Sequence, residues 1–331
     1  MLSEFSLIDR YFARRARMNT RRAALGIGDD CALIAPAAGE MLAVSTDMLV
    51  EGRHFLPDVD PHALGHKALA VNLSDLAAMG AAPLGFTLAF ALPKPREDWL
   101  EAFSAGMFEL ADRYDCELIG GDTTAGPLNL CITVFGSVRR DVALRRDAAQ
   151  PGDDIWVSGT PGDARAGLGV LRGDWPQAQI ASADAAHFRR ALEYPEPRVA
   201  LGLALAGIAR AALDISDGLA GDLLHILECS RLSAVVDVDA LPLSDALARL
   251  PHALQLQCAL AGGDDYELCF TAAQAQRAAV EAAAQQAGVR VTRIGTMTSP
   301  DAHARPAITW RDASGAPLNL TLQGFDHFHA D

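Results

Sequence analysis

One stretch of the sequence constrains this chain most: residues 44–54, Val-Ser-Thr-Asp-Met-Leu-Val-Glu-Gly-Arg-His. Residues 41–44 are apolar, which predicts a short strand that ends where Ser45, Thr46 and Asp47 begin. Two hydroxyls and a carboxylate side by side predict an oxygen surface suited to a hard cation such as Mg²⁺. An ordinary strand end with a capping Asp and solvated neighbours gives the same pattern, so this stretch alone leaves both interpretations open.

The same association of apolar runs with acidic residues recurs along the chain. It appears at Asp29 and Asp30, Asn72 and Asp75, Gly121 and Asp122, Asp214 and Asp217, and Asp264 and Asp265. Crowded carboxylates repel one another, so such clusters favour a nearby cation. Simpler interpretations remain open for some: the first pair suits a Gly-Asp turn, and Asp217 suits the N-cap of a helix over residues 219–230. We interpret Asp153 and Asp154, before a predicted strand, as turn residues.

The charge pattern limits how this chain can bind phosphates. Its net charge is −14, which argues against a nucleic-acid partner, because binding a phosphate backbone needs clustered Lys and Arg. The only lysines are Lys67 and Lys94, and neither follows the glycines of a P-loop. Glycines 167, 169 and 173 do not form a dinucleotide fingerprint. Bound metal ions and arginines are therefore expected to hold any phosphate.

Cysteine usage and hydropathy predict the compartment. The six cysteines are scattered, with no C-x-x-C pair, and most stand in apolar runs. This distribution predicts buried thiols in a reducing environment, so we expect a cytoplasmic protein. No apolar run reaches the roughly 18 residues that a membrane span needs, and no membrane association is expected.

Helices and strands are predicted to alternate, which is typical of α/β or α+β architecture. A predicted helix over residues 61–79 puts Asn72 and Asp75 on one face, and residues 84–92 form an apolar strand. Glu267 stands among apolar residues of a predicted strand and should have a partner. The length of 331 residues suits two domains, with a boundary near the turn Pro151-Gly-Asp-Asp154.

Taken in order, these stretches resemble the thiamine-monophosphate kinase family over nearly the whole chain. The matching segments are Gly26-Ile-Gly-Asp-Asp30, Ser45-Thr-Asp47, Gly52-Arg-His54-Phe, Asn72-Leu-Ser-Asp75, Gly120-Gly-Asp122-Thr, Asp214-Ile-Ser-Asp217-Gly218, Asp264-Asp265-Tyr-Glu267 and Gly324-Phe325-Asp-His-Phe328. The resemblance implies a two-domain aminoimidazole-ribonucleotide synthetase-like fold. Domain 1–148 would bind ATP and Mg²⁺ and pair its sheet across a homodimer, and the α/β domain 149–331 would complete the nucleotide and substrate site.

The resemblance also implies a reaction, in which ATP phosphorylates thiamine monophosphate to thiamine diphosphate with several Mg²⁺ ions per active site. The implied metal ligands are Asp30, Ser45, Thr46, Asp47, Asp75, Asp122, Asp214 and Asp217. The implied ATP contacts are Ser104, Gly121, Asp122, Arg146 and Ser216, and the implied thiamine contacts are His54, Glu267 and Phe325. Two positions depart from the family: Ser104 replaces a Tyr that many members carry near the nucleotide, and Phe325 replaces a Trp of some members.

The chemistry of such a reaction agrees with the residues. A phosphate acceptor is already largely ionised near neutral pH, so no general base is expected among the site residues. Mg²⁺ held by aspartates would offset the repulsion between two anionic substrates. Two alternatives stay open: another ATP-dependent synthetase of the same superfamily, and a non-catalytic Mg-nucleotide-binding assembly protein.

Overall fold

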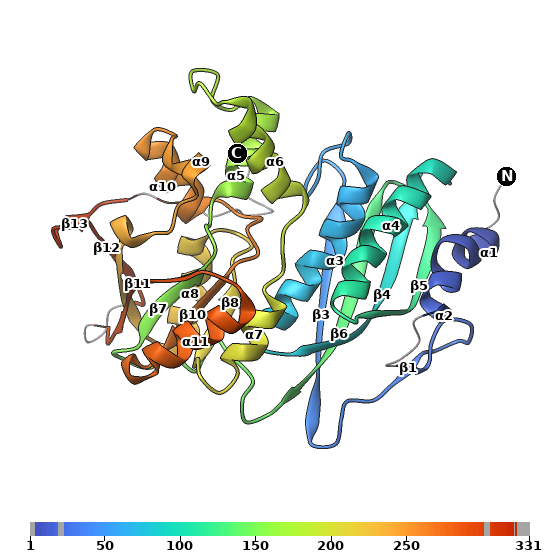
Figure 1. Cartoon of the computed structure of the whole chain (residues 1–331), viewed down its shortest axis with the longest axis horizontal. Coiled ribbons are helices and arrows are strands. Elements are labelled where there is room, and N and C mark those ends of the chain that lie inside the picture. Colours follow the sequence, from blue (N-terminus) through green and yellow to red (C-terminus); the bar gives the residue numbers. More distant parts are fainter. Residues whose placement is uncertain (1–3, 19–22, 301–304, 321, 323–331) are drawn as a thin grey trace. The chain divides into compact units, whose positions relative to one another are not determined.

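The computed structural model of the chain describes residues 4–18, 23–300, 305–320 and 322. The chain divides into two compact units, the first formed by Met1–Leu76 and Ala81–Arg140, the second by Ala77–Gly80 and Asp141–Asp331. Both combine sheets with helices (Figure 1), which confirms the predicted α/β (α+β) class. The roles given to domains 1–148 and 149–331 stay predictions. Among the described helices, none is both long and apolar enough to cross a membrane.

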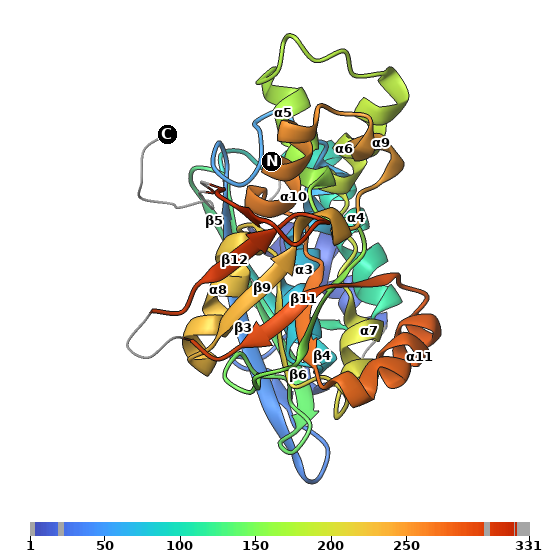
Figure 2. The same cartoon turned by 90° about the vertical axis from the view of Figure 1, so that its left-hand side faces the viewer.

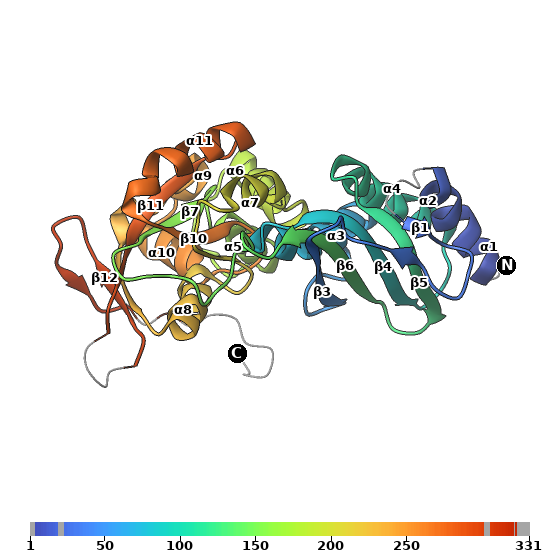
Figure 3. The ribbon, with the colours of Figure 1, turned by 90° about the horizontal axis from the view of Figure 1, so that it is seen from below.

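The first unit is built on a four-stranded sheet with the order β3-β6-β4-β5. Strands β4 and β5 are parallel, and the other neighbours are antiparallel. Helices α3 and α4 cover one face of this sheet (Figure 3), where Phe103 of α4 stacks on Phe90 of β4. The elements are α1 (Glu4–Leu7), the π-helix η1 (Ile8–Ala13), α2 (Arg14–Met18), β1 (Ala23–Leu25), β2 (Leu33–Ile34), β3 (Glu40–Val50), α3 (Pro61–Ala78), β4 (Ala82–Leu92), α4 (Glu97–Arg113), β5 (Glu117–Ala125) and β6 (Asn129–Arg139).

Strand β3 is longer than predicted, and this changes where its polar residues lie. Strand β3 runs to Val50 because each of its residues pairs with β6, so Asp47 lies within the strand and not after it. Strand β5 likewise continues through Asp122. Side chains alternate between the two faces of a strand. Ser45 and Asp47 therefore face α3, whereas Thr46 contacts Thr133 on the other face, and the predicted single surface of three oxygen-bearing side chains is wrong.

The predicted helix over residues 61–79 is confirmed as α3, and its contact with α4 is made by backbone. A Cβ added to Gly65 would lie 2.0 Å from the carbonyl oxygen of Phe103. A Cβ added to Gly106 would lie 2.0 Å from the carbonyl oxygen of His62. Two glycines therefore let the helices touch directly, and this contact fixes the face of α3 that Asn72 and Asp75 present to β3.

The second unit is built on a seven-stranded mixed sheet with the order β13-β12-β9-β11-β7-β10-β8. Figure 2 shows β12, β9 and β11 side by side in that order. Its elements are β7 (Asp154–Ser158), α5 (Asp163–Arg172), α6 (Ser182–Glu193), α7 (Val199–Leu205), β8 (Ala211–Asp214), α8 (Leu219–Ser230), β9 (Ser233–Asp237), the 3₁₀ turns η2 (Val238–Ala240) and η3 (Gln274–Gln276), α9 (Asp245–Ala248), α10 (His252–Ala261), β10 (Leu268–Ala272), α11 (Arg277–Ala287), β11 (Val291–Thr298), β12 (Ile308–Arg311) and β13 (Pro317–Leu318).

The core of the second unit forms where α8 and α10 pack on this sheet. Ile155 and Val157 of β7 and Leu223 of α8 are buried there in one apolar cluster. The central strands β7 and β10 are buried at every residue and mostly apolar, as expected for a sheet covered on both faces. Cys258 and Cys269 are buried free thiols of this unit, as expected, although Cys229 is exposed.

The structure contradicts the interpretation of Asp153 and Asp154 as turn residues. Their exposed fractions are only 2% and 0%, and both carboxylates are paired. Arg277 donates two hydrogen bonds to Asp154, at 2.6 and 2.8 Å, and Arg210 donates one to Asp153 at 2.9 Å. A local Gly-Asp pattern carries no sign of these arginines, which lie more than fifty residues away in the chain. The earlier interpretation is therefore wrong.

We predict that Gly65→Ala lowers the free energy of unfolding by roughly 1–3 kcal/mol, because the new methyl group forces α3 away from α4. Gly221→Ala in α8 is the matched control, since nothing lies within 4 Å of its added Cβ. The control should be neutral or stabilising by up to about 1 kcal/mol. Urea unfolding followed by circular dichroism measures both. Equal stability of the Gly65→Ala variant and the wild type would contradict direct helix contact.

Candidate functional site

A group of polar residues gathers between β3 and α3 of the first unit. The hydroxyl of Ser45 donates a short hydrogen bond to the carboxylate of Asp75. The backbone N–H of Asp47 donates to the side-chain oxygen of Asn72 at 3.2 Å, and the amide of Asn72 donates to the carbonyl of Ala68 at 3.1 Å. The strand places Ser45 and Asp47 two residues apart, and the helix places Asn72 and Asp75 three apart, so all four face one another. We call these four residues the β3–α3 group.

The charges of the β3–α3 group favour a bound cation. Burial raises the pKa of Asp47 to about 6, and the charge of Asp75 raises it as well. Two carboxylates, a hydroxyl and an amide oxygen form the donor set that hard cations such as Mg²⁺ prefer. Among the residues that the structure describes, no three His, Cys, Asp or Glu side chains converge to hold a metal on their own. Mg²⁺ commonly completes its shell with water and substrate phosphates, so this donor set fits the ion.

Gly121 and Asp122 lie across the same sheet from the β3–α3 group. Asp47 pairs with Ile132, Ile132 with Leu88, and Leu88 with Gly121, which places Gly121 three strand spacings away, roughly 14 Å. Asp122 is exposed on β5, and its assignment to a metal and to ATP stays a prediction. Gly121 has a φ of 148°, and an added Cβ would lie 1.9 Å from the carbonyl oxygen of Leu88, so only glycine fits.

Three other predicted residues of the first unit stand outside the β3–α3 group. Asp30 is exposed in a bend after β1. His54 lies in the turn after β3, where the backbone N–H of Val50 donates to its Nδ1 at 2.9 Å and fixes the ring. Ser104 is buried on α4, and its hydroxyl donates to the carbonyl of Glu101 at 3.2 Å. Their assignment to metal, thiamine and ATP stays a prediction.

A second group of predicted residues follows β8 in the second unit. Asp214 is buried at the end of this strand, and residues 215–218 form the loop that leads into α8. One carboxylate oxygen of Asp222 accepts hydrogen bonds from the backbone N–H groups of Ser216 and Asp217, both at 3.1 Å, and of Gly218 at 3.0 Å. Gly218 is the N-cap of α8, so the alternative interpretation of Asp217 as the cap is wrong.

The 215–218 loop is held from its other side by residues 263–267. Backbone N–H groups of Asp264 and Tyr266 donate to the carbonyls of Ser216 and Ile215 at 2.9 and 2.8 Å, and Ile215 donates to the carbonyl of Glu267 at 2.7 Å. Asp264 and Tyr266 have φ of 69° and 52°, a conformation that costs side-chain-bearing residues free energy. Such strain persists where surrounding contacts determine the backbone, as they do here.

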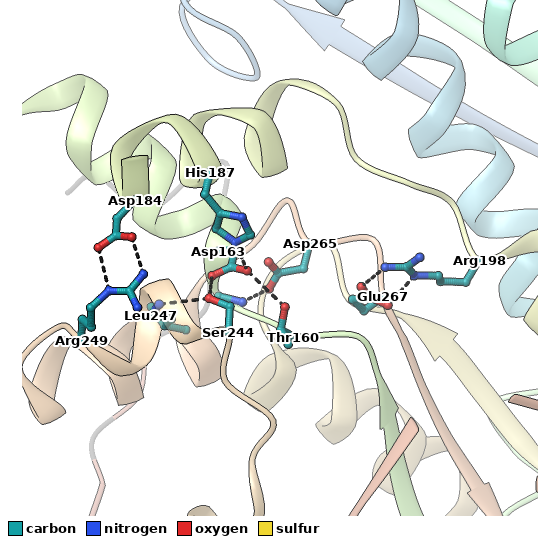
Figure 4. Close-up of polar contacts among 11 residues, drawn as sticks. Thr160, Asp163, Asp184, His187, Arg198, Ser244, Leu247, Arg249, Asp265 and Glu267 are labelled. Carbon is teal, nitrogen blue, oxygen red and sulfur yellow. Dashed lines mark hydrogen bonds and ion pairs between the residues drawn. The ribbon is translucent and has the colours of Figure 1, made fainter. Parts of the chain in front are cut away.

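Glu267 has the partner that its apolar surroundings predict. Arg198 donates two hydrogen bonds to its carboxylate, one of them at 2.7 Å (Figure 4). The hydroxyl of Ser158 donates a short third one. Strand β10 begins at Leu268, so the predicted position of Glu267 within the strand is wrong by one residue. The carboxylate is buried and fully paired, and it is fixed before any ligand arrives.

Glu267 lines a cavity of about 260 Å³ within the second unit. Asp163, in its wall, accepts hydrogen bonds from Ser244 at 2.6 Å and Thr160 at 3.1 Å, and lies 2.9 Å from the Nε2 of His187 (Figure 4). Asp265 accepts one from the backbone N–H of Gly162 at 2.7 Å, and burial raises its pKa well above the ordinary value. Sequence reasoning missed Asp163, His187 and Arg198, because no local pattern distinguishes them.

The last two predicted residues are Arg146 and Phe325. Arg146 is exposed in the second unit, and its backbone carbonyl accepts a hydrogen bond from the hydroxyl of Ser230 at 2.8 Å. That bond fixes its main chain, and its predicted contact with ATP stays a prediction. Phe325 lies outside the described residues, so its predicted contact with thiamine stays a prediction as well.

Comparisons with known proteins show which sequences and folds this chain resembles. Residues 28–138 match the family model of the N-terminal domain of AIR synthase related proteins, and residues 150–305 match that of the C-terminal domain. The chain is 50% identical over 328 residues, 98% of each chain, to a thiamine-monophosphate kinase of Salmonella typhimurium.

Solved structures extend the likeness to three dimensions. The crystal structure of a thiamine-monophosphate kinase from Stenotrophomonas maltophilia has a TM-score of 0.83 at 50% identity, covering 93% of this chain and 96% of that one. A structure of AaThiL complexed with AMPPCP and TMP has a TM-score of 0.73 at 29% identity, covering 99% and 97%. The predicted two-domain fold of the aminoimidazole-ribonucleotide synthetase type is thereby confirmed.

We predict that Arg198→Met lowers the free energy of unfolding by roughly 3–5 kcal/mol, because it leaves the carboxylate of Glu267 buried without a counter-charge. Adding Glu267→Gln should recover part of the lost free energy of unfolding, since the second change removes the buried carboxylate charge that has no partner. Arg145→Met, which breaks the exposed pair with Asp147, is the control and should leave stability unchanged. Denaturant unfolding measures all of these variants. A double variant less stable than Arg198→Met would contradict this account.

Proposed function

Because this chain belongs to the thiamine-monophosphate kinase family, we propose that it transfers the γ-phosphoryl group of ATP to thiamine monophosphate and forms thiamine diphosphate. The observation that carries this proposal is the β3–α3 group, in which Ser45, Asp47, Asn72 and Asp75 converge as an all-oxygen donor set. Such a set suits metal-assisted transfer between two anionic substrates.

We propose that the β3–α3 group, together with Asp30, the main chain of Thr46, and Asp122, holds several Mg²⁺ ions in the first unit. Asp214 and Asp217 would hold further Mg²⁺ in the second. When bound, the ions neutralise phosphate charge and align the in-line transfer. The chain's own part is to orient these carboxylates: α3 turns Asp75 toward Ser45, and β3 places the half-buried Asp47 on the same face.

The nucleotide contacts that we propose are Ser104, Gly121, Asp122, Arg146 and Ser216. Among them, Gly121 lets the backbone come close, because it carries no side chain beside β4. Ser216 has both of its backbone groups engaged, its N–H by Asp222 and its carbonyl by Asp264, so its hydroxyl is the group that it offers to a ligand.

We propose that His54, Glu267 and Phe325 contact thiamine monophosphate. The backbone of Val50 fixes the ring of His54, and Arg198 fixes the carboxylate of Glu267, so each would present a rigid surface to the substrate. An acceptor phosphate arrives ionised, so the chain needs no general base for it. Free thiamine carries an alcohol instead, whose activation would need such a base.

We predict that the wild-type protein converts thiamine monophosphate to thiamine diphosphate with ATP and Mg²⁺, and that free thiamine is at least roughly 100-fold poorer as an acceptor, because alcohol activation requires a base worth about that factor. Chromatographic detection of both products under equal conditions measures this ratio. Equal phosphorylation of the two acceptors would contradict a site without a base.

The metal dependence of the same assay provides its control. EDTA should abolish turnover and added Mg²⁺ should restore it. Asp47→Asn should lower turnover by roughly 100-fold or more, since it removes a ligand charge, while native circular dichroism shows that the variant folds. A folded Asp47→Asn variant with wild-type turnover would remove Asp47 from the proposed site.

The oligomeric state belongs to the proposal as well, and an exposed apolar strip supports it. On β3 the side chains of Leu42, Val44, Met48 and Val50 are 40%, 55%, 56% and 37% exposed, and they alternate onto the face of the sheet away from α3. Apolar side chains in a row along one strand mark an interaction surface. We propose that two copies of the chain form a homodimer through this strip.

We predict that the wild-type protein sediments as a dimer at micromolar concentration and that Val44→Glu shifts it toward the monomer, because a charge in an apolar interface is left desolvated. Leu203→Glu on α7 of the second unit is the matched control, since Leu203 is also exposed but lies outside the strip. Analytical ultracentrifugation distinguishes the two states. A wild-type monomer, or a Val44→Glu variant that remains dimeric, would contradict this interface.

A further inference from the structure

Asp222 is a buried carboxylate for which the proposed reaction gives no role. It lies in the first turn of α8, its exposed fraction is 4%, and one of its oxygens accepts three backbone hydrogen bonds of 3.0–3.1 Å from residues 216–218. These are the loop residues that carry Ser216 and Asp217. The contact spans only four to six residues of sequence, yet it ties the helix to the loop before it.

Three N–H groups that converge at a helix N-terminus form a natural anion-binding nest. Here the nest is filled by the chain's own carboxylate, so residues 216–218 cannot offer these amides to a phosphate. The carbonyls of Ile215 and Ser216 are also engaged, by Tyr266 and Asp264. What the loop can present to a ligand is therefore its side chains, and their direction depends on how the backbone is fixed.

We propose that Asp222 is a positioning residue, which fixes the backbone of residues 216–218 so that the hydroxyl of Ser216 and the carboxylate of Asp217 point where Mg-nucleotide binds. The inference rests on the proposed function, because it takes Ser216 and Asp217 as ligand contacts. Charge-assisted bonds from one anion to three amides are stronger than neutral ones, which makes a carboxylate suited to the task. Removing it would leave three amides open to water or to a misplaced phosphate.

The test compares Asp222→Ala and Asp222→Asn with two controls. The Asn variant keeps an oxygen that can accept the same bonds, and the Ala variant has none. Glu228→Ala, on the same helix, removes an exposed carboxylate. Leu247→Ala creates a cavity in the core of the second unit. This control shows how a loss of stability by itself affects the exchange and kinetic measurements.

Two measurements are made on each variant, well below its unfolding temperature. The first is amide hydrogen exchange of residues 216–218, which needs no ligand and no activity. The second is steady-state kinetics with thiamine monophosphate, giving kcat, the KM for ATP and the Mg²⁺ concentration for half-maximal rate. Direct binding of Mg-AMPPCP by calorimetry supplies an affinity that does not depend on turnover.

We expect Asp222→Ala to speed exchange at residues 216–218 and to raise the KM for ATP and the Mg²⁺ requirement by roughly 10- to 100-fold, the usual effect of losing a group that orients a ligand. Asp222→Asn should remain within roughly threefold of the wild type, since a neutral acceptor keeps the bonds in weaker form. Both controls should leave the KM and the Mg²⁺ requirement unchanged, although Leu247→Ala lowers the unfolding temperature.

Some outcomes would overturn the inference. They are an Asp222→Ala variant with wild-type exchange, one with wild-type affinity for Mg-AMPPCP, or a Leu247→Ala variant that shows the same rise in KM. A wild-type protein that binds Mg-AMPPCP but transfers no phosphate to thiamine monophosphate would refute the proposed function instead. The exchange and calorimetric comparisons of the variants would still decide the role of Asp222.

Discussion

The structure depends on one constraint, which is that a buried carboxylate must be compensated. Burying an ionised carboxylate without partners costs several kcal/mol, and this acidic chain buries many of them. The compensation differs from place to place. Arginine neutralises Asp154 and Glu267, hydroxyls surround Asp163, and three backbone amides hold Asp222.

Asp47 differs from the arginine-paired carboxylates of Asp154 and Glu267, because its charged neighbour in the β3–α3 group is another carboxylate, that of Asp75. Its own burial and the like charge of Asp75 both oppose ionisation, whereas Arg249 lowers the pKa of Asp184 on α6. A carboxylate whose fold disfavours its charge is a typical feature of functional sites. The oxygens that surround Asp47 in the β3–α3 group are donors of the kind that a divalent cation prefers.

The fold fixes the backbone in both regions where we propose that ligands bind. Glycines 65 and 106 bring α3 and α4 into direct contact, and this contact sets the face on which Asn72 and Asp75 meet β3. In the second unit, the 215–218 loop is bonded on one side to Asp222 and on the other to residues 263–267. Both arrangements place the side chains that we propose as ligand contacts on a fixed main chain, which would reduce the reorganisation that binding needs.

The sequence by itself determined the family, the α/β class, helix α3 with Asn72 and Asp75 on one face, and the need of Glu267 for a partner. These follow from periodicity, from local composition and from motifs in a fixed order, all of which are written along the chain. The tertiary structure decided what depends on distant pairing. Strand β3 continues through Asp47 because β6 pairs with it, Thr46 turns away because strand side chains alternate, and Asp154 is buried because Arg277 reaches it. A contact between residues far apart in sequence leaves no local pattern, so only the folded chain could show which carboxylates are neutralised by distant arginines and which lie beside another carboxylate.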